Sequence, residues 1–269
     1  GGKPRGKPSK KARAKIAARA AAFVPMVLDA ASGATYPAES VPRLEHGKTY
    51  VREVECVVPT NVNSVLENYY QLGPDELELR VAVDMLEQVM QEPLFDALRT
   101  KQQLGYRVDC STRLTGNVVG FCIRVQSSEY KPAVLNDRVE RFLRDFRGTL
   151  LTMTGAKFSG YVEALVEQKL HRENNLAEES LRHWGEIESR RYEFDACTSE
   201  AAALRRLAPE RLVAVFDAAF SAERRRKLSV RIVGKSRVGA KPGPGEADSD
   251  EEDDSDYTDD EDSEDDGSE

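Results

Sequence analysis

The sequence predicts an α+β fold in which helices pack on a mostly antiparallel sheet, with a disordered tail at each end. Strand-like segments come in groups instead of alternating singly with helices, in the order ββααββαααααβ. The segment between the tails is long enough to bury a hydrophobic core as one domain. No internal repeat is visible in it.

Charge divides the chain into three parts. The 269 residues carry a net charge of −8, but residues 1–22 contain eight Lys or Arg and no acid, and residues 246–269 contain sixteen Asp or Glu and no base. Tails of this composition have almost no apolar surface to bury, so we expect them to be disordered. The predicted organisation is a basic linker at 1–22, one domain at 23–235 and an acidic tail at 236–269.

The first half of the domain starts with two strands and two helices. Lys48–Pro59 alternates apolar and charged residues, and Val62–Leu72 returns as a second strand. A helix then starts at Gly73–Glu76, because proline and acids favour a first turn. Its apolar residues recur at helical spacing, namely Leu79, Val83, Leu86 and Met90.

A second helix and a hairpin follow. Glu92-Pro93 is expected to break the first helix, and the second carries Leu94, Phe95, Leu98 and Arg99 before it ends ahead of Gly105. The hairpin consists of Tyr106–Arg113 and Val118–Ser127. The remaining expected helices are Leu135–Leu150, Gly160–His171, Leu176–Tyr192, Thr198–Leu207 and Pro209–Phe220, and the last strand is Lys227–Val233.

Several classes of protein are excluded. No apolar run approaches the ~18 residues of a membrane span, and the N-terminus lacks the apolar stretch of a signal peptide. Four cysteines without a C-x-x-C pair argue against a disulfide scaffold. We therefore expect a cytoplasmic protein without a membrane partner, with the nucleus as an open alternative. The first residue is Gly rather than Met, which suggests a fragment or a processed start.

The residues themselves indicate no catalytic set. The sequence contains no P-loop, G-x-S-x-G or zinc-binding H-x-x-E-H motif. Glu167 and His171 are four residues apart, but two ligands do not make a zinc site, and a solvated pair on a helix is favoured. His183 is expected to be partly buried. Cys110 and Cys122 fall near opposing hairpin positions, where free core thiols are favoured over a disulfide.

One stretch carries a resemblance. Glu92–Tyr106 reads EPLFDALRTKQQLGY, and three further motifs follow it: Val139-Glu140-x-Phe142-Leu143, Trp184-Gly185-Glu186-Ile187 and Tyr192-x-Phe194-Asp195. Together they resemble the C-terminal half of the pitrilysin (inverzincin) zinc metallopeptidases, in their insulin-degrading enzyme and nardilysin branch. The similarity extends from Thr49 to Val233.

The resemblance implies a fold, a partner and a site. Members of the family consist of two bowl-shaped halves that close around a peptide substrate, and the first domain holds the zinc. This chain resembles the fourth domain, so the resemblance implies zinc in the parent enzyme, no metal ligand here, and an N-terminal zinc-bearing half as partner. It also implies that Arg99 and Tyr106 contact the substrate, with Phe95 on the same wall. The alternatives are a surface salt bridge for Arg99 and an aromatic at the core edge for Tyr106.

Two functions remain open at this stage. One is a C-terminal substrate-binding domain of a zinc metalloendopeptidase, inactive alone because the zinc motif is missing from the chain. The other is a non-catalytic interaction or scaffold protein that kept the peptidase fold.

The basic segment has the composition of a nucleic-acid or nuclear-import patch, but a solvated linker is favoured. The acidic tail either aids solubility, which is favoured, or binds basic partners.

Overall fold

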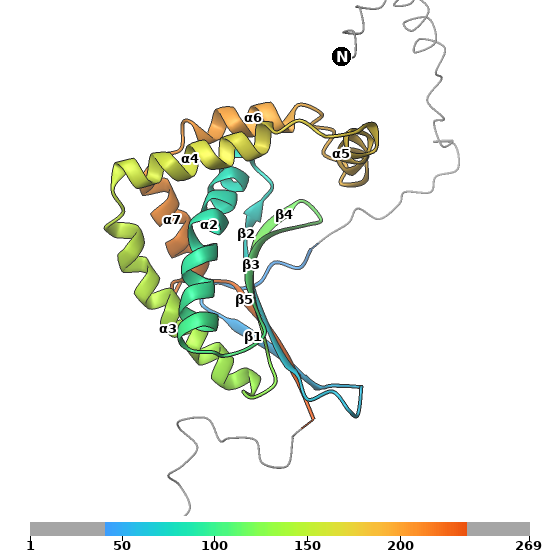
Figure 1. Ribbon diagram of the computed structural model, residues 1–269, viewed down its shortest axis with the longest axis vertical. Helices are drawn as coiled ribbons and strands as arrows, with labels where there is room; N and C mark the ends of the chain where they lie inside the picture. The colour runs from blue at the N-terminus through green and yellow to red at the C-terminus, as the bar shows by residue number, and fades with distance from the viewer. Residues whose placement is uncertain (1–40, 236–269) are drawn as a thin grey trace, which may run out of the picture. The chain divides into compact units, whose positions relative to one another are not determined.

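The computed structural model describes residues 41–235, and the predicted tails at 1–22 and 236–269 lie outside this range. The described residues form a five-stranded sheet in the order β1-β5-β2-β4-β3, with helices gathered on one side of it (Figure 1). The elements are β1 (Thr49–Glu55), β2 (Ser64–Pro74), α2 (Leu77–Phe95), the π-helical turn η2 (Asp96–Lys101), β3 (Arg107–Thr115), β4 (Val118–Ser127), α3 (Pro132–Leu151), α4 (Gly155–Leu170), α5 (Leu176–Glu188), α6 (Ala196–Leu204), α7 (Pro209–Phe220) and β5 (Lys227–Val233).

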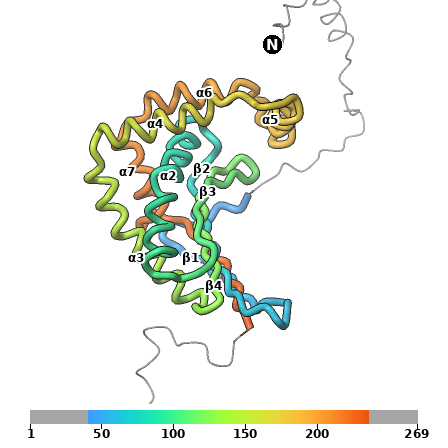
Figure 2. The backbone as a smooth tube through the Cα atoms, in the orientation of Figure 1, coloured from blue at the N-terminus to red at the C-terminus, as the bar shows by residue number. Residues whose placement is uncertain are grey.

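The sheet is antiparallel except at one edge, as the sequence predicted. β2 pairs antiparallel with β4 and β5, β3 pairs antiparallel with β4, and only β1 runs parallel to its neighbour β5. The tube view shows β1, β2 and β5 side by side at the lower end of the sheet (Figure 2). Placing β1 next to β5, the first and last strands of residues 41–235, needs a long-range contact that no local pattern encodes.

The core lies between the sheet and the helices. In β2 buried and half-buried residues alternate, so Leu66 and Tyr70 face the helices while Val65 and Glu67 face the opposite side. Phe220 at the end of α7 meets the ring of Tyr70 edge-on, with 4.8 Å between centroids. One face of the sheet is therefore covered by helices, and the other is called the open face below.

Helix α2 does not break where the sequence predicted. Pro93 lies inside α2, and the chain continues without interruption into η2 instead of starting a second helix. Burial of most of the preceding turns outweighs the missing amide of the proline. At the other end, Pro74 is the last residue of β2 and the helix begins only at Leu77, so the expected helix start at Gly73–Glu76 was three residues early.

The later helices are confirmed as elements, but several ends differ. α4 begins at Gly155, five residues before the expected start, because the Thr154 side chain caps it by accepting from the Lys157 N–H at 3.3 Å. α5 ends at Glu188 instead of Tyr192, because Arg190 and Tyr192 have φ of +59° and +58°, which a helix does not allow.

Helix α5 differs from the others in its surroundings. Of its thirteen residues only Glu186 is buried, while Leu176, Leu181, Trp184 and Ile187 are exposed. Figure 1 shows α5 away from the helices that cover the sheet. Among residues 41–235, no helix combines the length and the apolar character needed to cross a membrane.

Candidate functional site

Three side chains predicted to act together are brought together by the fold. The guanidinium carbon of Arg99 lies 5.5 Å from the ring centre of Phe95 and 5.9 Å from that of Tyr106. Both distances are in the range of cation–π contact. Arg99 therefore lies between two aromatic rings, at the point where α2 and η2 end and β3 begins.

Helical spacing explains half of this arrangement. Phe95 and Arg99 are four residues apart along α2 and η2, so they lie on one side of the helix. Tyr106 arrives through a turn in which Gln103 has φ +50° and the Leu104 N–H donates to the carbonyl of Leu98 at 3.0 Å. The buried Leu104 side chain anchors this turn in the core.

Gly105 is required by close packing. A Cβ at this position would lie 2.0 Å from the backbone oxygen of Gln126 in β4, closer than any side chain can approach. The turn can therefore pass β4 only with glycine, and this contact fixes where Tyr106 emerges. Each residue of the Leu-Gly-Tyr sequence thus has its own part in the turn. Leu104 anchors the turn in the core, Gly105 allows the close contact with β4, and Tyr106 presents an exposed ring.

The polar groups of the cluster, the guanidinium of Arg99 and the hydroxyl of Tyr106, can donate hydrogen bonds. Arg99 Nη1 donates to the carbonyls of Gly105 at 3.1 Å and Tyr106 at 2.5 Å, which leaves Nη2 and Nε for a ligand. Within the described part of the chain, no carboxylate forms an ion pair with Arg99. The Tyr106 side chain is 79% exposed and that of Phe95 43%, so neither ring is part of the core.

Next to this cluster, the open face of the sheet carries a chain of ion pairs that the sequence analysis missed. Arg107 pairs with Asp109 at 2.5 Å, Asp109 with Arg124 at 3.3 Å, Arg124 with Glu67 at 2.9 Å and Glu67 with Arg113 at 3.0 Å. The signal was the two-residue spacing of charges along β3, which places Arg107, Asp109 and Arg113 on one face. Three guanidinium groups against two carboxylates leave this ladder positive.

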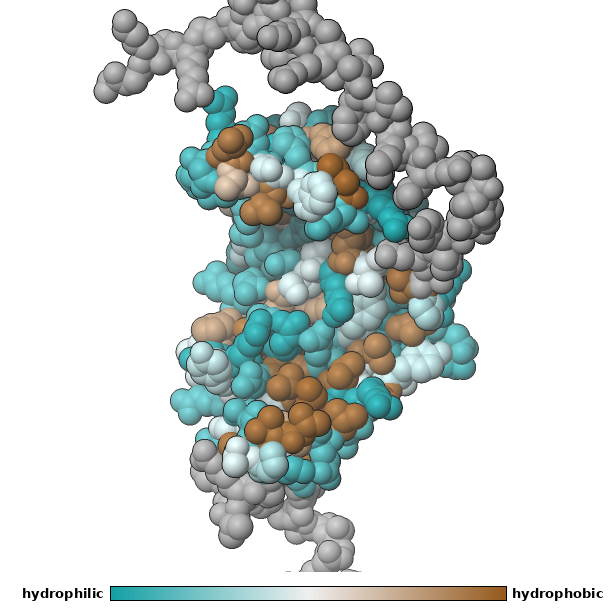
Figure 3. Space-filling model, turned by 90° about the vertical axis from the view of Figure 1, so that its right-hand side faces the viewer, coloured by the Kyte–Doolittle hydropathy of each residue, from teal (hydrophilic) through white to brown (hydrophobic). Residues whose placement is uncertain are grey.

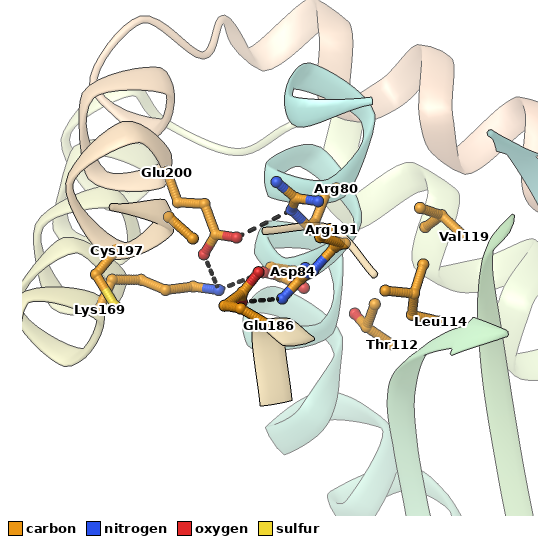
Figure 4. Close-up of a pocket in the computed structure, with 11 residues that line it drawn as sticks. Arg80, Asp84, Thr112, Leu114, Val119, Lys169, Glu186, Arg191, Cys197 and Glu200 are labelled. Atoms are coloured by element: carbon orange, nitrogen blue, oxygen red, sulfur yellow. Dashed lines mark hydrogen bonds and ion pairs between the residues drawn. The ribbon is translucent and has the colours of Figure 1, made fainter. Parts of the chain in front are cut away.

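A second charged cluster lies at a cavity of about 330 Å³ that is lined by residues of α2, β3, β4, α4, α5 and α6 (Figure 4). Arg80 pairs there with Asp75, Glu193 and Glu200, and Lys169 pairs with Asp84 at 2.6 Å and Glu200 at 2.8 Å. Burial alone would lower the pKa of Lys169, but the two carboxylates raise it above its usual value. These ion pairs connect α2, α4 and α6. Because each cation has a carboxylate partner, the cluster presents no unpaired charge to a ligand.

The histidines and cysteines contribute no metal centre to the described region. Between residues 41 and 235, no three or more His, Cys, Asp or Glu side chains come together as metal ligands, so these residues do not fit a bound zinc ion. Glu167 and His171 are both exposed at the end of α4, and His183 is half-buried against the ring of Phe194. All four cysteines are free, which for Cys110 and Cys122 is the alternative that the sequence favoured. Cys110 lies opposite Ile123, so it and Cys122 point to opposite faces of the sheet.

Comparison with known proteins identifies the relatives. The family model described as PQQ synthase PqqF-like, C-terminal lobe domain 4, matches residues 85–184. The chain is 36% identical over 193 residues to the nardilysin-like protein of Arabidopsis thaliana, covering 70% of this chain and 19% of that protein. It is 34% identical over 184 residues to human nardilysin, covering 68% of this chain and 16% of that protein. The chain belongs to the pitrilysin family.

Solved structures agree on the fold of this pitrilysin-family domain. The structure of pitrilysin matches with a TM-score of 0.65 at 22% identity, over 76% of this chain and 22% of that one. A peptidase M16 inactive domain from Pseudomonas fluorescens matches with a TM-score of 0.59 at 14% identity, over 87% of this chain and 53% of that one. The chain spans about a fifth of the length of the curated relatives.

Two of the motifs that carried the resemblance prove to have structural partners. The Glu140 carboxylate accepts from Lys227 and Arg225, both at 2.6 Å, and thereby connects α3 to β5. Glu186 is buried and pairs with Arg191 at 2.5 Å, which holds the turn after α5. These acids therefore stabilise the domain, while the rings of Phe95 and Tyr106 are exposed and Arg99 between them is half-buried.

Proposed function

We propose that this chain is the substrate-binding C-terminal domain of a zinc metalloendopeptidase. The zinc site belongs to an N-terminal half that the described residues do not include, and this half and the peptide substrate are the proposed partners. The single observation that carries the proposal is Arg99, held between Phe95 and Tyr106 with donor groups free and no carboxylate partner among the described residues.

The chemistry of this cluster suits a peptide backbone. The free Nη2 or Nε of Arg99 and the hydroxyl of Tyr106 can each donate to a substrate carbonyl, and the exposed ring of Phe95 supports an apolar side chain. Where such a donor also reaches the developing oxyanion, its removal typically costs about 2.7–4 kcal/mol of transition-state stabilisation. The residues of this chain would then position the peptide, while the partner half supplies the metal.

Reconstitution tests the proposal. The full chain is mixed with the zinc-bearing N-terminal half of a related peptidase, and cleavage of a fluorogenic peptide is followed. We expect no cleavage by the chain alone, cleavage by the mixture, and a loss in kcat/KM of about 100-fold for Arg99→Ala and a smaller loss for Tyr106→Phe. Lys101→Ala is the matched control, since Lys101 is exposed on the same turn and pairs only with Asp96.

The same experiment separates the alternative function. A scaffold that kept the peptidase fold would bind a partner without cleavage in any mixture. If the mixture cleaves the peptide but Arg99→Ala and Lys101→Ala have the same activity, the chain is still the C-terminal domain of a peptidase. The role of Arg99 in substrate binding is then wrong. If a stable mixed complex forms and never cleaves, the scaffold function replaces the enzymatic one.

A further inference from the structure

The edge of the sheet farthest from Arg99 has no structural cover. β1 is the outermost strand, and all seven of its residues, Thr49 to Glu55, are exposed. Exposed edge strands are normally short, covered or bulged, because their free amide groups pair with other chains. Within residues 41–235 β1 is neither bulged nor covered by a helix, and its protection is the charge of Arg52, Glu53 and Glu55. Its edge is therefore available to a strand of complementary charge.

The backbone geometry shows which groups are free. The Lys227 N–H donates to the carbonyl of Lys48 at 3.2 Å, and the Cys56 N–H donates to the carbonyl of Val233 at 2.8 Å. These bonds fix the even-numbered residues of β1 as the ones that face β5. Because alternate residues of a strand direct their amide groups to opposite sides, Thr49, Val51, Glu53 and Glu55 direct theirs outward.

The opposite edge of the same sheet is protected. On β3, the outward N–H of Thr112 donates to a carboxylate oxygen of Glu87 in α2 at 2.6 Å. The thiol of Cys110 donates to the Gln91 side chain of the same helix at 3.4 Å. Side chains of α2 therefore contact β3, whereas all seven residues of β1 are exposed. The difference between the two edges indicates a binding surface at β1.

The side chains of β1 define what an added strand would meet. On the open face lie Tyr50, Arg52 and Val54, and behind them an apolar strip of half-buried side chains continues across β5 and β2: Leu228, Val230, Ile232 and Val65. Figure 3 shows hydrophobic side chains gathered in the lower half of this face. On the other face lie Val51, Glu53 and Glu55.

We propose that β1 binds an extended peptide of another polypeptide as an antiparallel sixth strand. Among the described residues Arg52 has no ion-pair partner, so charge complementarity requires an acidic residue opposite it. Glu53 and Glu55 lie 3.7 Å from Arg231 and 2.6 Å from Lys235, but their side chains remain exposed and favour basic residues opposite them. Apolar residues fit opposite Tyr50, Val51 and Val54. The main-chain hydrogen bonds supply the affinity and the alternating side chains the specificity. This surface is separate from the Arg99 cluster, because four strand spacings, about 19 Å, separate β1 from β3.

A second copy of this chain fits the edge less well. A two-fold antiparallel pairing centred on Arg52 places Arg52 opposite itself, and one centred on Glu53 places Glu53 opposite itself. Like charges directly opposite are destabilising. A pairing centred on Val51 joins only residues 49–53 and leaves Val54 and Glu55 without partners. A peptide of complementary charge meets none of these conflicts.

A synthetic peptide tests the proposal on the full chain. The probe is fluorescein-labelled Lys-Val-Lys-Glu-Val-Phe-Thr, which pairs in order with residues 55 to 49. The control is the charge-reversed Glu-Val-Glu-Lys-Val-Phe-Thr. By fluorescence polarisation we expect the control to bind at least tenfold more weakly. We expect the same loss for the probe with N-methyl groups on its third and fifth residues, since these amides face β1.

Two variants locate the binding on β1. Val51→Pro removes an outward N–H without removing a bond to β5, and should weaken the probe at least tenfold, whereas Val51→Ala should stay within threefold. Glu53→Lys should reverse the preference between probe and control, and it does not depend on a proline being tolerated. Equal binding of the two peptides by the wild-type chain, or an unchanged preference in Glu53→Lys, would overturn the proposal. So would concentration-dependent dimers in light scattering that Val51→Pro abolishes, since they would assign the edge to a second copy.

Discussion

The ammonium group of Lys227 is buried against the carboxylate of Glu140. Their Nζ and Oε1 atoms are 2.6 Å apart, and the Lys227 side chain is 1% exposed. Asn136 accepts a second hydrogen bond from the same ammonium group at 2.6 Å, and the ring centre of Tyr70 lies 5.7 Å away. Burial lowers the pKa of Lys227, and the facing Glu140 only partly offsets this. The pair joins α3 to the last strand of the sheet.

Removing the carboxylate should therefore destabilise the domain strongly. Glu140→Ala leaves a buried cation without its partner, and we expect a loss of about 3–5 kcal/mol in the free energy of unfolding by urea denaturation. The matched control is Asp217→Ala, which breaks the bidentate but exposed pair with Arg147 and should change stability little. Equal effects of the two substitutions would show that the Lys227 ammonium is solvated in the folded protein.

The same pair gives a pH dependence with a defined sign. Burial by itself raises the pKa of Glu140, but Lys227 and Arg225 outweigh it and hold that pKa below 4.5. A carboxyl group whose pKa is lowered by folding stabilises the folded state above its unfolded pKa, and this contribution is lost as the pH falls through the folded value. The contribution of the Glu140 carboxylate, measured as the stability of the wild type relative to Glu140→Gln, should be fully present just above pH 4.5 and shrink as the pH falls below it. An advantage that grows on acidification would contradict the ion pair.

Two glycines should respond in opposite directions to alanine. At Gly120 in β4, a Cβ would lie 2.2 Å from the ring of Tyr69, so Gly120→Ala must displace that ring, at a cost of about 1–3 kcal/mol in thermal or urea unfolding. At Gly160 inside α4, a Cβ meets nothing within 4 Å, so Gly160→Ala should stabilise by about 0.5–1 kcal/mol. A neutral Gly120→Ala would mean that Tyr69 does not lie against β4.

The cysteines should fall into two classes of reactivity. Burial raises the pKa of the thiols of Cys110 and Cys122, so little thiolate forms there at neutral pH. Cys56 and Cys197 are only half-buried. Titration with a chromogenic disulfide should therefore detect two fast thiols in the native chain and four after denaturation. Two variants distinguish the classes. Cys56→Ser should reduce the number of fast-reacting thiols in the native chain by one, whereas Cys110→Ser should leave that number unchanged.

The sequence predicted the strands and the grouping of elements well, because these depend on local apolar spacing. Lys227–Val233 was predicted residue for residue, since it alternates strictly between faces. The continuation of α2 through Pro93 was missed, because the energy that keeps this helix intact comes from tertiary burial, which one sequence window does not contain. The start of α4 was missed because it depends on the Thr154 cap. The end of α5 was missed because it depends on the positive φ of Arg190 and Tyr192.

The candidate site was accessible from the sequence only in part. Helical spacing places Phe95 beside Arg99, but the approach of Tyr106 depends on a turn that passes closely over β4 at Gly105, and it was inferred only from family resemblance. The uncovered edge at β1 was not visible at all, since exposure of a strand edge depends on how far the helices extend over the sheet.

The position of α5 has a practical consequence for spectroscopy. Trp184 is the only tryptophan of the chain, and its side chain is 55% exposed on that helix. Its indole emission will therefore be red-shifted in the native protein and will change little when the core melts. Fluorescence of this residue is instead a selective reporter for anything that settles on α5, whereas global unfolding is better followed by far-ultraviolet circular dichroism.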